Sequence, residues 1–403
     1  MAKLLVLDGH SAAALAFVRS LGRAGHWISV GSNRGIFAAA ALSRYCRLSF
    51  EYPVSTDDAS AFSDVVLDFV RQNNVDLILP MTDWTTLPMS RCREKFAGIC
   101  KIAVPSHETL ELAADKYATI QLAQRLNIPV PGTWLIASVQ GLESIGELSF
   151  PLVVKDRSSA RWIGDRAVFG TVSYAYSQED LYQKVEQRLS AAGDVLVQTF
   201  TPGIGVGFSC LVSDGKIFIP FQWERIRETD PRGSGSSSRK SVPLDERIVD
   251  FSTSLIMASG YQGIVMVEYK EALDTGEPIL MEINGRPWGS IALPIADGID
   301  YPRYFVDWFL EGKLPPQKIS YKPIVCRRMI GELAHLDNVR RGKPPGWPLP
   351  YPDFLTTLAK VAMPWYPGVR FDDIWLSDPR PGIAGISNWF SSKLKKKPAM
   401  SRS

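Results

Sequence analysis

Residues 264–286 read IVMVEYKEALDTGEPILMEINGR, and the interpretation of the whole chain starts from them. Two apolar runs flank a turn rich in Gly, Pro and Asp, which predicts a β-hairpin. Side chains two positions apart on a strand leave the same face, so Glu282 and Asn284 point together and Arg286 continues the alternation. Glu268 ends the apolar part of the first strand, and we expect it beside them.

The polar face of this hairpin carries the donor atoms of a metal site. Two carboxylates and one amide oxygen are hard ligands that suit Mg²⁺, which usually arrives with phosphate. We therefore predict that Glu268, Glu282 and Asn284 bind Mg²⁺, with Mn²⁺ as the alternative ion. The competing interpretation is an edge hairpin with a solvated charged face, and the neighbouring segments favour the metal site.

The composition is that of an ordinary globular protein. The 403 residues are 45% hydrophobic and 22% charged, with a net charge of +3. This length is enough for two or three domains, and the small charge argues against a nucleic-acid partner. Five cysteines without a C-x-x-C pair favour free thiols, and no apolar run is long enough to span a bilayer. We expect a soluble, cytoplasmic protein.

The N-terminal part alternates apolar runs with a helical segment. The runs at 3–8, 27–30, 77–80 and 101–105 predict strands, and the Ala-rich segment 11–23 predicts a helix. This order is typical of a parallel α/β sheet. The turn after the first strand lacks the second and third glycines of a dinucleotide fingerprint, which argues against bound NAD(P).

Two lysines precede the hairpin at positions suited to anion binding. Lys116 lies near the middle of a helix predicted over 106–127, and Lys155 closes the predicted strand 151–155. A lysine that ends an apolar strand must reach solvent or meet an anion. The polar loop 156–170 follows it, contains three arginines and could cover phosphate groups.

Two further cations lie between these lysines and the hairpin. Glycines at 203, 205 and 207 follow the predicted strand 195–200 and let the backbone approach something flat or bulky. Arg225 and Arg227 lie on the next predicted strand, and we expect at least one of them to contact an anion. The Gly- and Ser-rich stretch 229–239 is predicted to be either a disordered loop or a loop that orders over a substrate.

The order of these parts resembles the ATP-grasp superfamily, and within it the carboxylate–amine ligases. A helix lysine, a strand-end lysine, a polar loop, the segment VLVQTFTPG, a basic strand and the EINGR hairpin follow one another over residues 105–310. The resemblance implies an ATP-dependent ligase that activates a carboxylate as an acyl phosphate and joins it to an amine, releasing ADP and phosphate. Its substrates would be small, amino-acid-like molecules.

The resemblance also implies a role for each candidate residue. Lys116 and Lys155 would contact the phosphates of ATP. Arg286, with Arg225 or Arg227, would hold the substrate carboxylate or the transferred phosphate. The adenine edge would meet Gln198 and the backbone of Thr199, Phe200 and Thr201.

The implied architecture is an α/β parallel-sheet domain, an α+β ATP-grasp domain of two lobes and a C-terminal extension. We place the first domain at 1–105, the lobes at 106–192 and 193–312, and the extension at 313–403. The basic residues at 393–397 predict a solvated tail. Peripheral contact of this tail with an anionic membrane is the less favoured alternative.

Two other functions remain open on the sequence. A non-catalytic module would bind ATP without releasing phosphate, and the intact Glu, Asn and Arg set argues against it. An NAD(P)-dependent oxidoreductase built on the N-terminal sheet would keep its dinucleotide after loss of residues 106–310, and the missing glycines argue against it.

Overall fold

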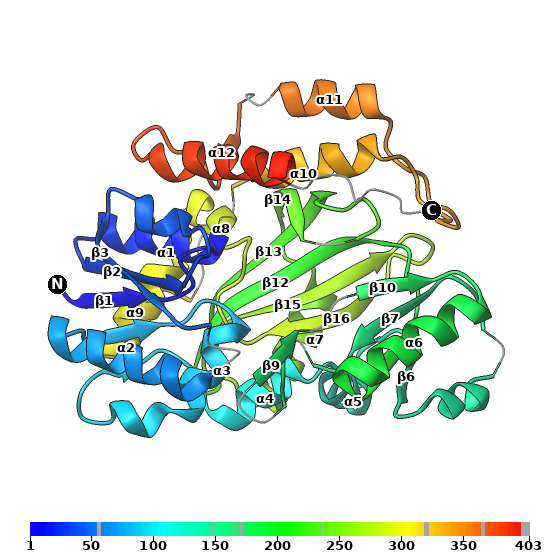
Figure 1. Cartoon of the computed structure of the whole chain (residues 1–403), viewed down its shortest axis with the longest axis horizontal. Coiled ribbons are helices and arrows are strands. Elements are labelled where there is room, and N and C mark those ends of the chain that lie inside the picture. The colour runs from blue at the N-terminus through cyan, green and yellow to red at the C-terminus, as the bar shows by residue number, and fades with distance from the viewer. Residues whose placement is uncertain are drawn as a thin grey trace.

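The computed structural model describes residues 1–54, 58–146, 148–158, 160–163, 166–169, 172–233, 235–317, 322–363 and 367–395. A parallel sheet comes first, two antiparallel sheets follow, and a layer of helices ends the chain (Figure 1). The predicted fold class, an α/β domain followed by a two-lobed α+β domain and an extension, is confirmed.

The N-terminal domain is a five-stranded parallel sheet in the order β3-β2-β1-β4-β5. The predicted strands and helix of this region are all present. Strand β3 was not predicted, because most of its side chains are exposed and its sequence, CRLSFEY, carries little apolar signal. The elements are β1 (Lys3–Val6), α1 (Ala12–Arg23), β2 (Trp27–Asn33), β3 (Cys46–Tyr52), α2 (Ala59–Asn73), β4 (Leu77–Leu79), α3 (Asp83–Arg91) and β5 (Lys101–Ile102).

The first lobe begins with two helices where one was predicted. The helix expected over 106–127 is broken at Asp115, whose backbone is extended and whose carboxylate accepts hydrogen bonds from the backbone N–H groups of Tyr117 and Ala118. Lys116 is therefore the first residue of a helix instead of a residue in its middle. The two helices are α4 (His107–Ala114) and α5 (Lys116–Arg125).

A four-stranded antiparallel sheet in the order β10-β7-β11-β6 completes the first lobe, with α6 packed on it. Strand β11 is hydrogen-bonded to β6 and β7, so this sheet extends past the expected lobe boundary at 192. A separate hairpin of β8 and β9 lies beside it. The elements are β6 (Thr133–Ile136), β7 (Leu152–Asp156), β8 (Ala160–Ile163), β9 (Arg166–Phe169), β10 (Val172–Ala175), α6 (Gln178–Ala192) and β11 (Val195–Thr199).

The second lobe is a seven-stranded sheet in the order β16-β15-β12-β13-β14-β17-β18. Its last two strands come from the C-terminal extension: β17 pairs antiparallel with β14, and β18 pairs parallel with β17. The extension thus completes a sheet instead of only following one. The elements are β12 (Gly203–Ser213), β13 (Lys216–Glu228), β14 (Ser236–Val242), α7 (Glu246–Ala258), β15 (Gly263–Ala272), β16 (Pro278–Asn284), α8 (Ala292–Asp297), α9 (Tyr301–Glu311), β17 (Val325–Arg327) and β18 (Val369–Phe371).

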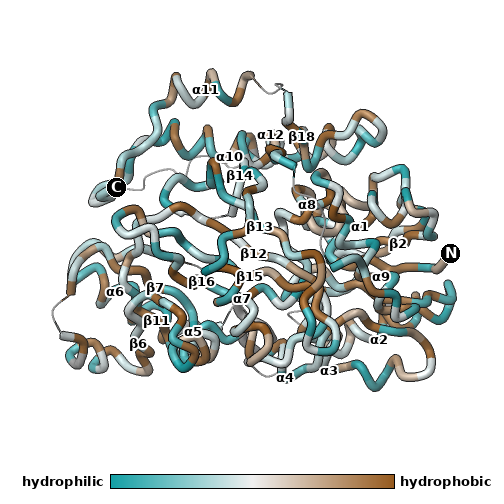
Figure 2. Tube along the Cα trace, turned by 180° about the vertical axis from the view of Figure 1, so that it is seen from behind, coloured by the Kyte–Doolittle hydropathy of each residue, from teal (hydrophilic) through white to brown (hydrophobic). Residues whose placement is uncertain are grey.

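Three helices of the extension form an outer layer over β14. Helix α10 (Met329–Arg340) packs on the sheet, and α11 (Phe354–Ala362) and α12 (Arg380–Lys395) both pack on α10. Seen from either side of the molecule, α11 is the outermost element (Figures 1 and 2).

One hydrophobic core joins the N-terminal domain to the second lobe. Leu4, Val6 and Phe17 of the first domain share a buried cluster with Trp288 and Phe305. The four-stranded sheet of the first lobe has a cluster of its own. The space between the lobes therefore lies between two separately packed sheets.

Arg19 fixes the end of the extension to the N-terminal domain. Its fully buried guanidinium donates to the Asp378 carboxylate at 2.9 Å and to three backbone carbonyls within residues 372–378. The same carboxylate accepts hydrogen bonds from the hydroxyl of Ser43 and the backbone N–H of Arg44. The extension is thus held by sheet pairing and by a buried ion pair.

We expect Asp378→Ala to lower the free energy of unfolding by about 3–5 kcal/mol, because Arg19 would stay buried without its carboxylate. The exposed pair of Lys95 and Asp64 gives the control: Asp64→Ala should cost about 1 kcal/mol or less. Chemical denaturation measures both values. Equal losses in the two variants would show that the buried pair does not anchor the extension.

Candidate active site

The predicted hairpin is present as β15 and β16, and its two carboxylates face each other across it. Glu268 and Glu282 are directly opposite in the antiparallel register. The register shifts immediately after this pair, so Tyr269 is opposite Leu280 and Met281 is a bulge residue. Met281 therefore lines the same pocket as Glu282.

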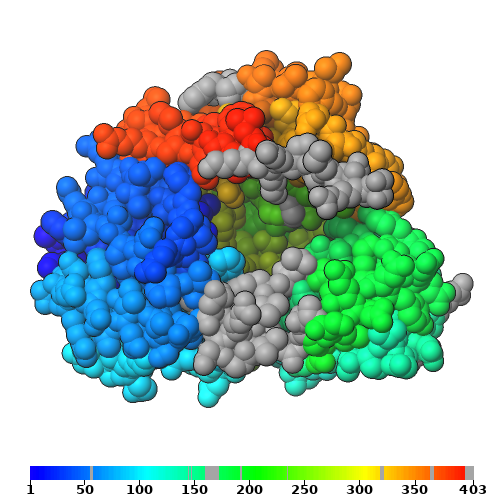
Figure 3. All heavy atoms as spheres, viewed as in Figure 1, coloured from blue at the N-terminus to red at the C-terminus, as the bar shows by residue number. Residues whose placement is uncertain are grey.

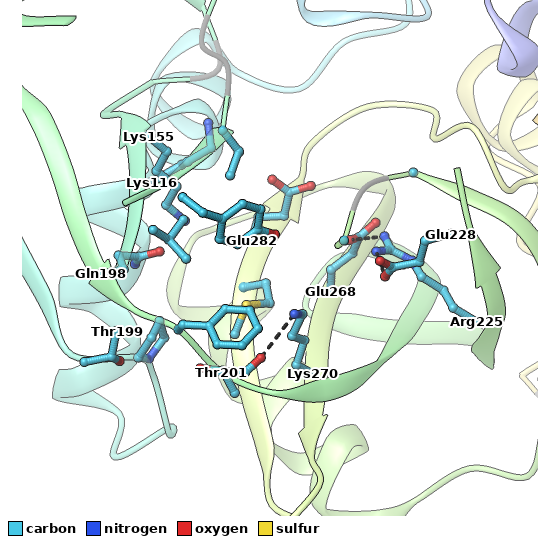
Figure 4. A pocket seen from close by; sticks show the side chains of 18 residues that line it. Lys116, Lys155, Gln198, Thr199, Thr201, Arg225, Glu228, Glu268, Lys270 and Glu282 are labelled. Carbon is cyan, nitrogen blue, oxygen red and sulfur yellow. Dashed lines mark hydrogen bonds and ion pairs between the residues drawn. The ribbon is translucent and has the colours of Figure 1, made fainter. Parts of the chain in front are cut away.

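This pocket lies between the two lobes and has a volume of about 310 Å³ (Figure 4). The molecular surface is hollowed between the N-terminal domain and the first lobe, with the second-lobe sheet as the floor (Figure 3). The pocket brings together most of the predicted site residues: Lys116, Lys155, Gln198, Thr199, Phe200, Thr201, Arg225, Glu268 and Glu282. It also has lining residues that were not predicted, among them Tyr174, Glu228, Lys270 and Met281.

Lys155 is the next-to-last residue of β7, one residue before the strand ends, and its side chain is buried in the pocket. Burial and the charge of Lys116 lower the pKa of Lys155 from 10.5 to about 8, and Glu282 opposes the shift. Both lysine side chains lie on the same side of Glu282 (Figure 4). Two mutually repelling ammonium groups in one pocket favour the binding of a polyanion.

Glu282 keeps its negative charge although it is only partly exposed to solvent. Burial raises the pKa of the carboxyl, but the cations Lys116, Arg286 and Lys155 and a hydrogen bond from Asn284 together bring it below its usual value. The Asn284 side-chain amide donates to Oε1 of Glu282 at 3.1 Å. Glu282 and Asn284 therefore lie next to each other, as predicted.

Arg225 connects Glu268 to a third carboxylate. Its guanidinium lies 2.6 Å from Glu268 and 3.0 Å from Glu228. Burial raises the pKa of Glu268, and the charge of Arg225 offsets part of that effect. The side of the pocket next to Glu268 is therefore a chain of alternating charges.

Glu268 and Glu282 fit a divalent cation that also takes oxygens from a ligand. Within the described ranges, no three His, Cys, Asp or Glu side chains converge on one point. Two carboxylates on neighbouring strands, with the Asn284 amide beside them, suit Mg²⁺, which usually keeps water and phosphate oxygens among its ligands. The metal assignment of these three residues stays a prediction.

Arg227 does not reach this pocket, contrary to expectation for a substrate-binding arginine. The pairing of β13 with β14 is irregular between Arg225 and Arg227. Arg227 instead contacts α10, where it lies 2.7 Å from the buried carboxylate of Glu332. Arg327 holds the same carboxylate at 2.8 Å. Of the two predicted arginines, Arg225 is the one that faces the pocket between the lobes.

Arg286 connects the hairpin to the N-terminal domain. Its Nε lies 3.0 Å from Oδ2 of Asp83, the first residue of α3. Asp83 was not among the predicted site residues. Arg286 does not line the pocket itself, but its charge contributes to the low pKa of Glu282. Its predicted contact with a substrate carboxylate would occur at the junction of the N-terminal domain and the second lobe.

Two glycines of β12 make room for side chains of β13. A Cβ at Gly205 would lie 2.6 Å from Cδ of Arg225, and a Cβ at Gly207 would lie 2.2 Å from the ring of Trp223. The glycine pattern predicted that the backbone approaches something flat or bulky. In the structure, these groups are the side chains of Arg225 and Trp223 on the neighbouring strand. Gly205 in particular lets Arg225 lie flat against the sheet.

The segment expected at the adenine edge has its side chains and carbonyls in defined contacts. Gln198 Nε2 donates to Thr133 Oγ1 at 2.7 Å, and the carbonyl of Thr201 accepts from Lys270 at 3.1 Å. Lys270 lies two residues after Glu268 on β15. The alternation that placed Glu268 in the site could therefore also have indicated Lys270.

The C-terminal extension contributes an aromatic side chain behind the pocket wall. The Trp347 ring lies 5.2 Å, centroid to centroid, from both Tyr174 and Phe200, and all three rings meet edge to face. Tyr174 and Phe200 line the pocket, so the buried Trp347 supports them from behind. The Pro-rich sequence around Trp347 gave no signal of this contact.

The two loops predicted to cover the site are described in part. In the 156–170 loop, the side chains of Arg161 and Arg166 lie outside the described residues, and Arg157 is ion-paired with two aspartates. In the stretch 229–239, residue 234 lies outside them, and two neighbouring glycines line the pocket. Residues 236–239 of the second stretch form the start of β14, which lies inside the seven-stranded sheet, so the expectation of a loop is wrong for them. Closure of the remaining loop residues over a substrate stays a prediction.

Comparisons with known proteins agree with this geometry. A family model described as "ATP-grasp in the biosynthetic pathway with Ter operon" matches residues 193–327. The carbamoyl phosphate synthase large chain of Archaeoglobus fulgidus is 25% identical over 268 residues, which are 62% of this chain and 24% of that protein. The chain thus spans about a quarter of the length of the curated relatives it matches.

Solved structures share the fold. The L-amino acid ligase of Bacillus licheniformis matches with a TM-score of 0.59 and 17% identity over 78% of both chains. The biotin carboxylase domain of Hydrogenobacter thermophilus 2-oxoglutarate carboxylase, in complex with MgADP and bicarbonate, has a TM-score of 0.64 and 15% identity over 81% of this chain and 74% of that chain. The family model over residues 193–327 identifies the chain as a member of the ATP-grasp superfamily, and the solved structures show that the shared fold extends over most of the chain.

Proposed function

We propose that the protein is an ATP-dependent ligase that activates a carboxylate as an acyl phosphate and joins it to an amine, releasing ADP and phosphate. One observation carries the proposal: in one pocket, the paired carboxylates of Glu268 and Glu282 face the lysines Lys116 and Lys155. Lysines offset the charge of a triphosphate, and carboxylates hold its metal ion. The likeness to an L-amino acid ligase supports amino-acid-like substrates.

The lining residues suggest how ATP would lie in the pocket. The adenine edge would meet Gln198 and the backbone of 199–201, and the phosphates would lie next to Lys116 and Lys155. The carboxylates of the hairpin would hold Mg²⁺ or Mn²⁺, which supplies positive charge to the phosphate oxygens. The likeness to a structure that contains MgADP supports both ligands.

The chemistry follows from charge. A carboxylate approaches a triphosphate only if the negative charge between them is offset. The carboxylate oxygen attacks the γ-phosphorus while the bond to the β–γ bridging oxygen breaks, which gives an acyl phosphate and ADP. The amine nitrogen then attacks the acyl carbon, loses a proton and expels phosphate. Lys116 and Lys155 would balance the phosphates, and Arg225 and Arg286 are the cations available to orient the carboxylate.

A non-catalytic ATP-binding module is the second candidate. The observation in its favour is the close ion pair of Arg225 with Glu268, at 2.6 Å, because this pair competes with metal binding by the carboxylate. The module would bind ATP but release no ADP with any carboxylate–amine mixture. Measurement of ADP release and of nucleotide binding in the same preparation separates the two functions.

We expect Glu282→Gln to lower substrate-dependent ADP release by about 100-fold or more, because the neutral amide loses the charge that holds the metal. Pairs of amino acids, and amino acids with hydroxylamine as a small acceptor, serve as substrates. Glu277→Gln, in the exposed turn of the same hairpin, is the control and should keep full activity. Full activity of Glu282→Gln would refute the metal assignment.

We expect nucleotide affinity to fall by about ten-fold from about pH 7 to about pH 9, because Lys155 has a pKa of about 8 and loses its proton in this range. ADP phosphates stabilise the charged lysine, so binding near pH 8 should also take up a proton. Calorimetry in buffers of different ionisation enthalpy measures this uptake. Lys155→Arg should remove both effects, and their persistence in this variant would assign them to another group.

The lowered pKa of Lys155 also affects folding stability, which rises with pH where the nucleotide affinity falls. Between about pH 8 and the ordinary lysine pKa of 10.5, the unfolded chain binds the proton that folded Lys155 has released. The contribution of Lys155 to stability without nucleotide therefore rises with pH in this window.

We expect Trp347→Ala to weaken ADP binding by about 5- to 100-fold, because the rings of Tyr174 and Phe200 each lose an aromatic contact of about 0.5–1.5 kcal/mol. Binding of a fluorescent ADP analogue measures this change. Trp389→Ala, whose ring contacts Phe390 instead, is the control and should leave affinity unchanged. An unchanged affinity of Trp347→Ala would show that the extension does not support the pocket.

A further inference from the structure

Positive charge is concentrated in the C-terminal extension. Residues 313–403 contain 16 Lys and Arg but 6 Asp and Glu, whereas residues 1–312 contain 29 and 36. The net charge of +3 is therefore the sum of a positive C-terminal extension and a negative remainder of the chain. Such an asymmetry indicates an anionic partner for the basic part.

Helix α11 presents an apolar stripe to solvent. Leu355 and Met363 are 70% and 71% exposed, and Leu358 is 40% exposed. Leu355 lies on the side of the helix opposite the buried Thr357 and Val361, Leu358 lies beside it, and Met363 is the C-cap residue that follows the helix. Apolar side chains therefore occur both on the inner face of this helix, which packs on α10, and on its outer face.

Helix α12 repeats this feature in the same layer. Ile383, Phe390 and Leu394 are spaced by seven and four residues and are 65%, 50% and 84% exposed. Beside this stripe, the Lys393 ammonium lies 5.4 Å from the centroid of the Trp389 ring. Helices α11 and α12 both pack on α10, so the two helices belong to one outer layer (Figures 1 and 2).

Cations lie next to these apolar stripes. Asp337 of α10 is shared by three of them, Arg340, Arg341 and Lys393, at 2.6–3.0 Å. One carboxylate cannot neutralise three cations, and the two arginine side chains are more than half exposed. The layer therefore combines exposed Leu, Met, Ile and Phe side chains with an excess of positive charge.

We propose that the outer face of α11 and α12 docks on the surface of an anionic phospholipid bilayer. Exposed apolar side chains flanked by Lys, Arg and Trp are the features of helices that lie in the membrane interface. Charge attracts the layer to anionic lipid, and the apolar stripes enter the headgroup region. Nucleic acid has the charge but offers no apolar region for the stripes. In the described part of the chain, no helix is long and apolar enough to cross a membrane, so the contact is peripheral.

Co-sedimentation of the full chain with vesicles tests this proposal. We expect binding to vesicles of phosphatidylcholine mixed with phosphatidylglycerol, little binding to pure phosphatidylcholine, and loss of binding as NaCl is raised from about 0.1 M to about 0.5 M. The double variant Leu355→Glu/Met363→Glu should bind the mixed vesicles about ten-fold less or weaker still. Leu273→Glu, which changes a leucine that is 62% exposed in the turn between β15 and β16, should bind like the parent.

Three results would overturn the proposal. The parent chain could stay in the supernatant with mixed vesicles at low salt, or the double variant could bind as the parent does. Light scattering could instead show a dimer of the parent chain that the double variant dissociates, in which case a second copy covers this face. Circular dichroism and the unfolding midpoint establish that the double variant is folded. None of these results depends on the ligase activity.

Discussion

Buried charge of both signs in one pocket is the constraint on which the rest of the structure depends. Lys155 is buried and Glu282 is half-buried, and the loss of water alone would favour the neutral form of each. Glu282 stays ionised because cations from two lobes and one neighbouring amide surround it. A single strand or helix cannot supply this set, so β7 and α5 must face β15 and β16 across the pocket. The two-lobed fold is the means by which opposite charges meet.

The N-terminal domain and the C-terminal extension both pack against the second lobe, which carries the two carboxylates. The N-terminal domain shares a core with the second lobe, Arg286 pairs with Asp83 across their junction, and Arg19 ties the extension to the same body. The four-stranded sheet of the first lobe packs around its own core. Lys155 therefore lies on the separately packed sheet, whereas Lys116 begins α5, which packs on β16, and the carboxylates lie on β15 and β16. This division suits the proposed site, which would have to admit and release a nucleotide.

Local patterns predicted the features that depend on local physics. Alternation along 264–286 placed Glu282 and Asn284 together, and the end of an apolar strand placed Lys155 in the pocket. The predicted helix over 106–127 is broken at Asp115, because the carboxylate of this residue caps the N-terminus of α5. Hydrophobic periodicity alone does not reveal such a cap. Arg227 lies outside the pocket because the pairing of β13 with β14 is irregular between Arg225 and Arg227. This irregularity depends on the partner strand, so the sequence of β13 alone does not reveal it. Trp347 could not be predicted, because its contacts with Tyr174 and Phe200 span more than a hundred residues.

The insertion of β17 beside β14 has a consequence for dissecting this protein. In the full chain, β14 is an interior strand, with β13 on one side and β17 on the other. A chain shortened to the expected end of the ATP-grasp domain, residue 312, would turn β14 into a sheet edge with unpaired backbone donors and acceptors. Such an edge is a template for pairing between molecules, so the shortened protein would be prone to aggregation. The extension is therefore needed to close the sheet, whatever else it binds.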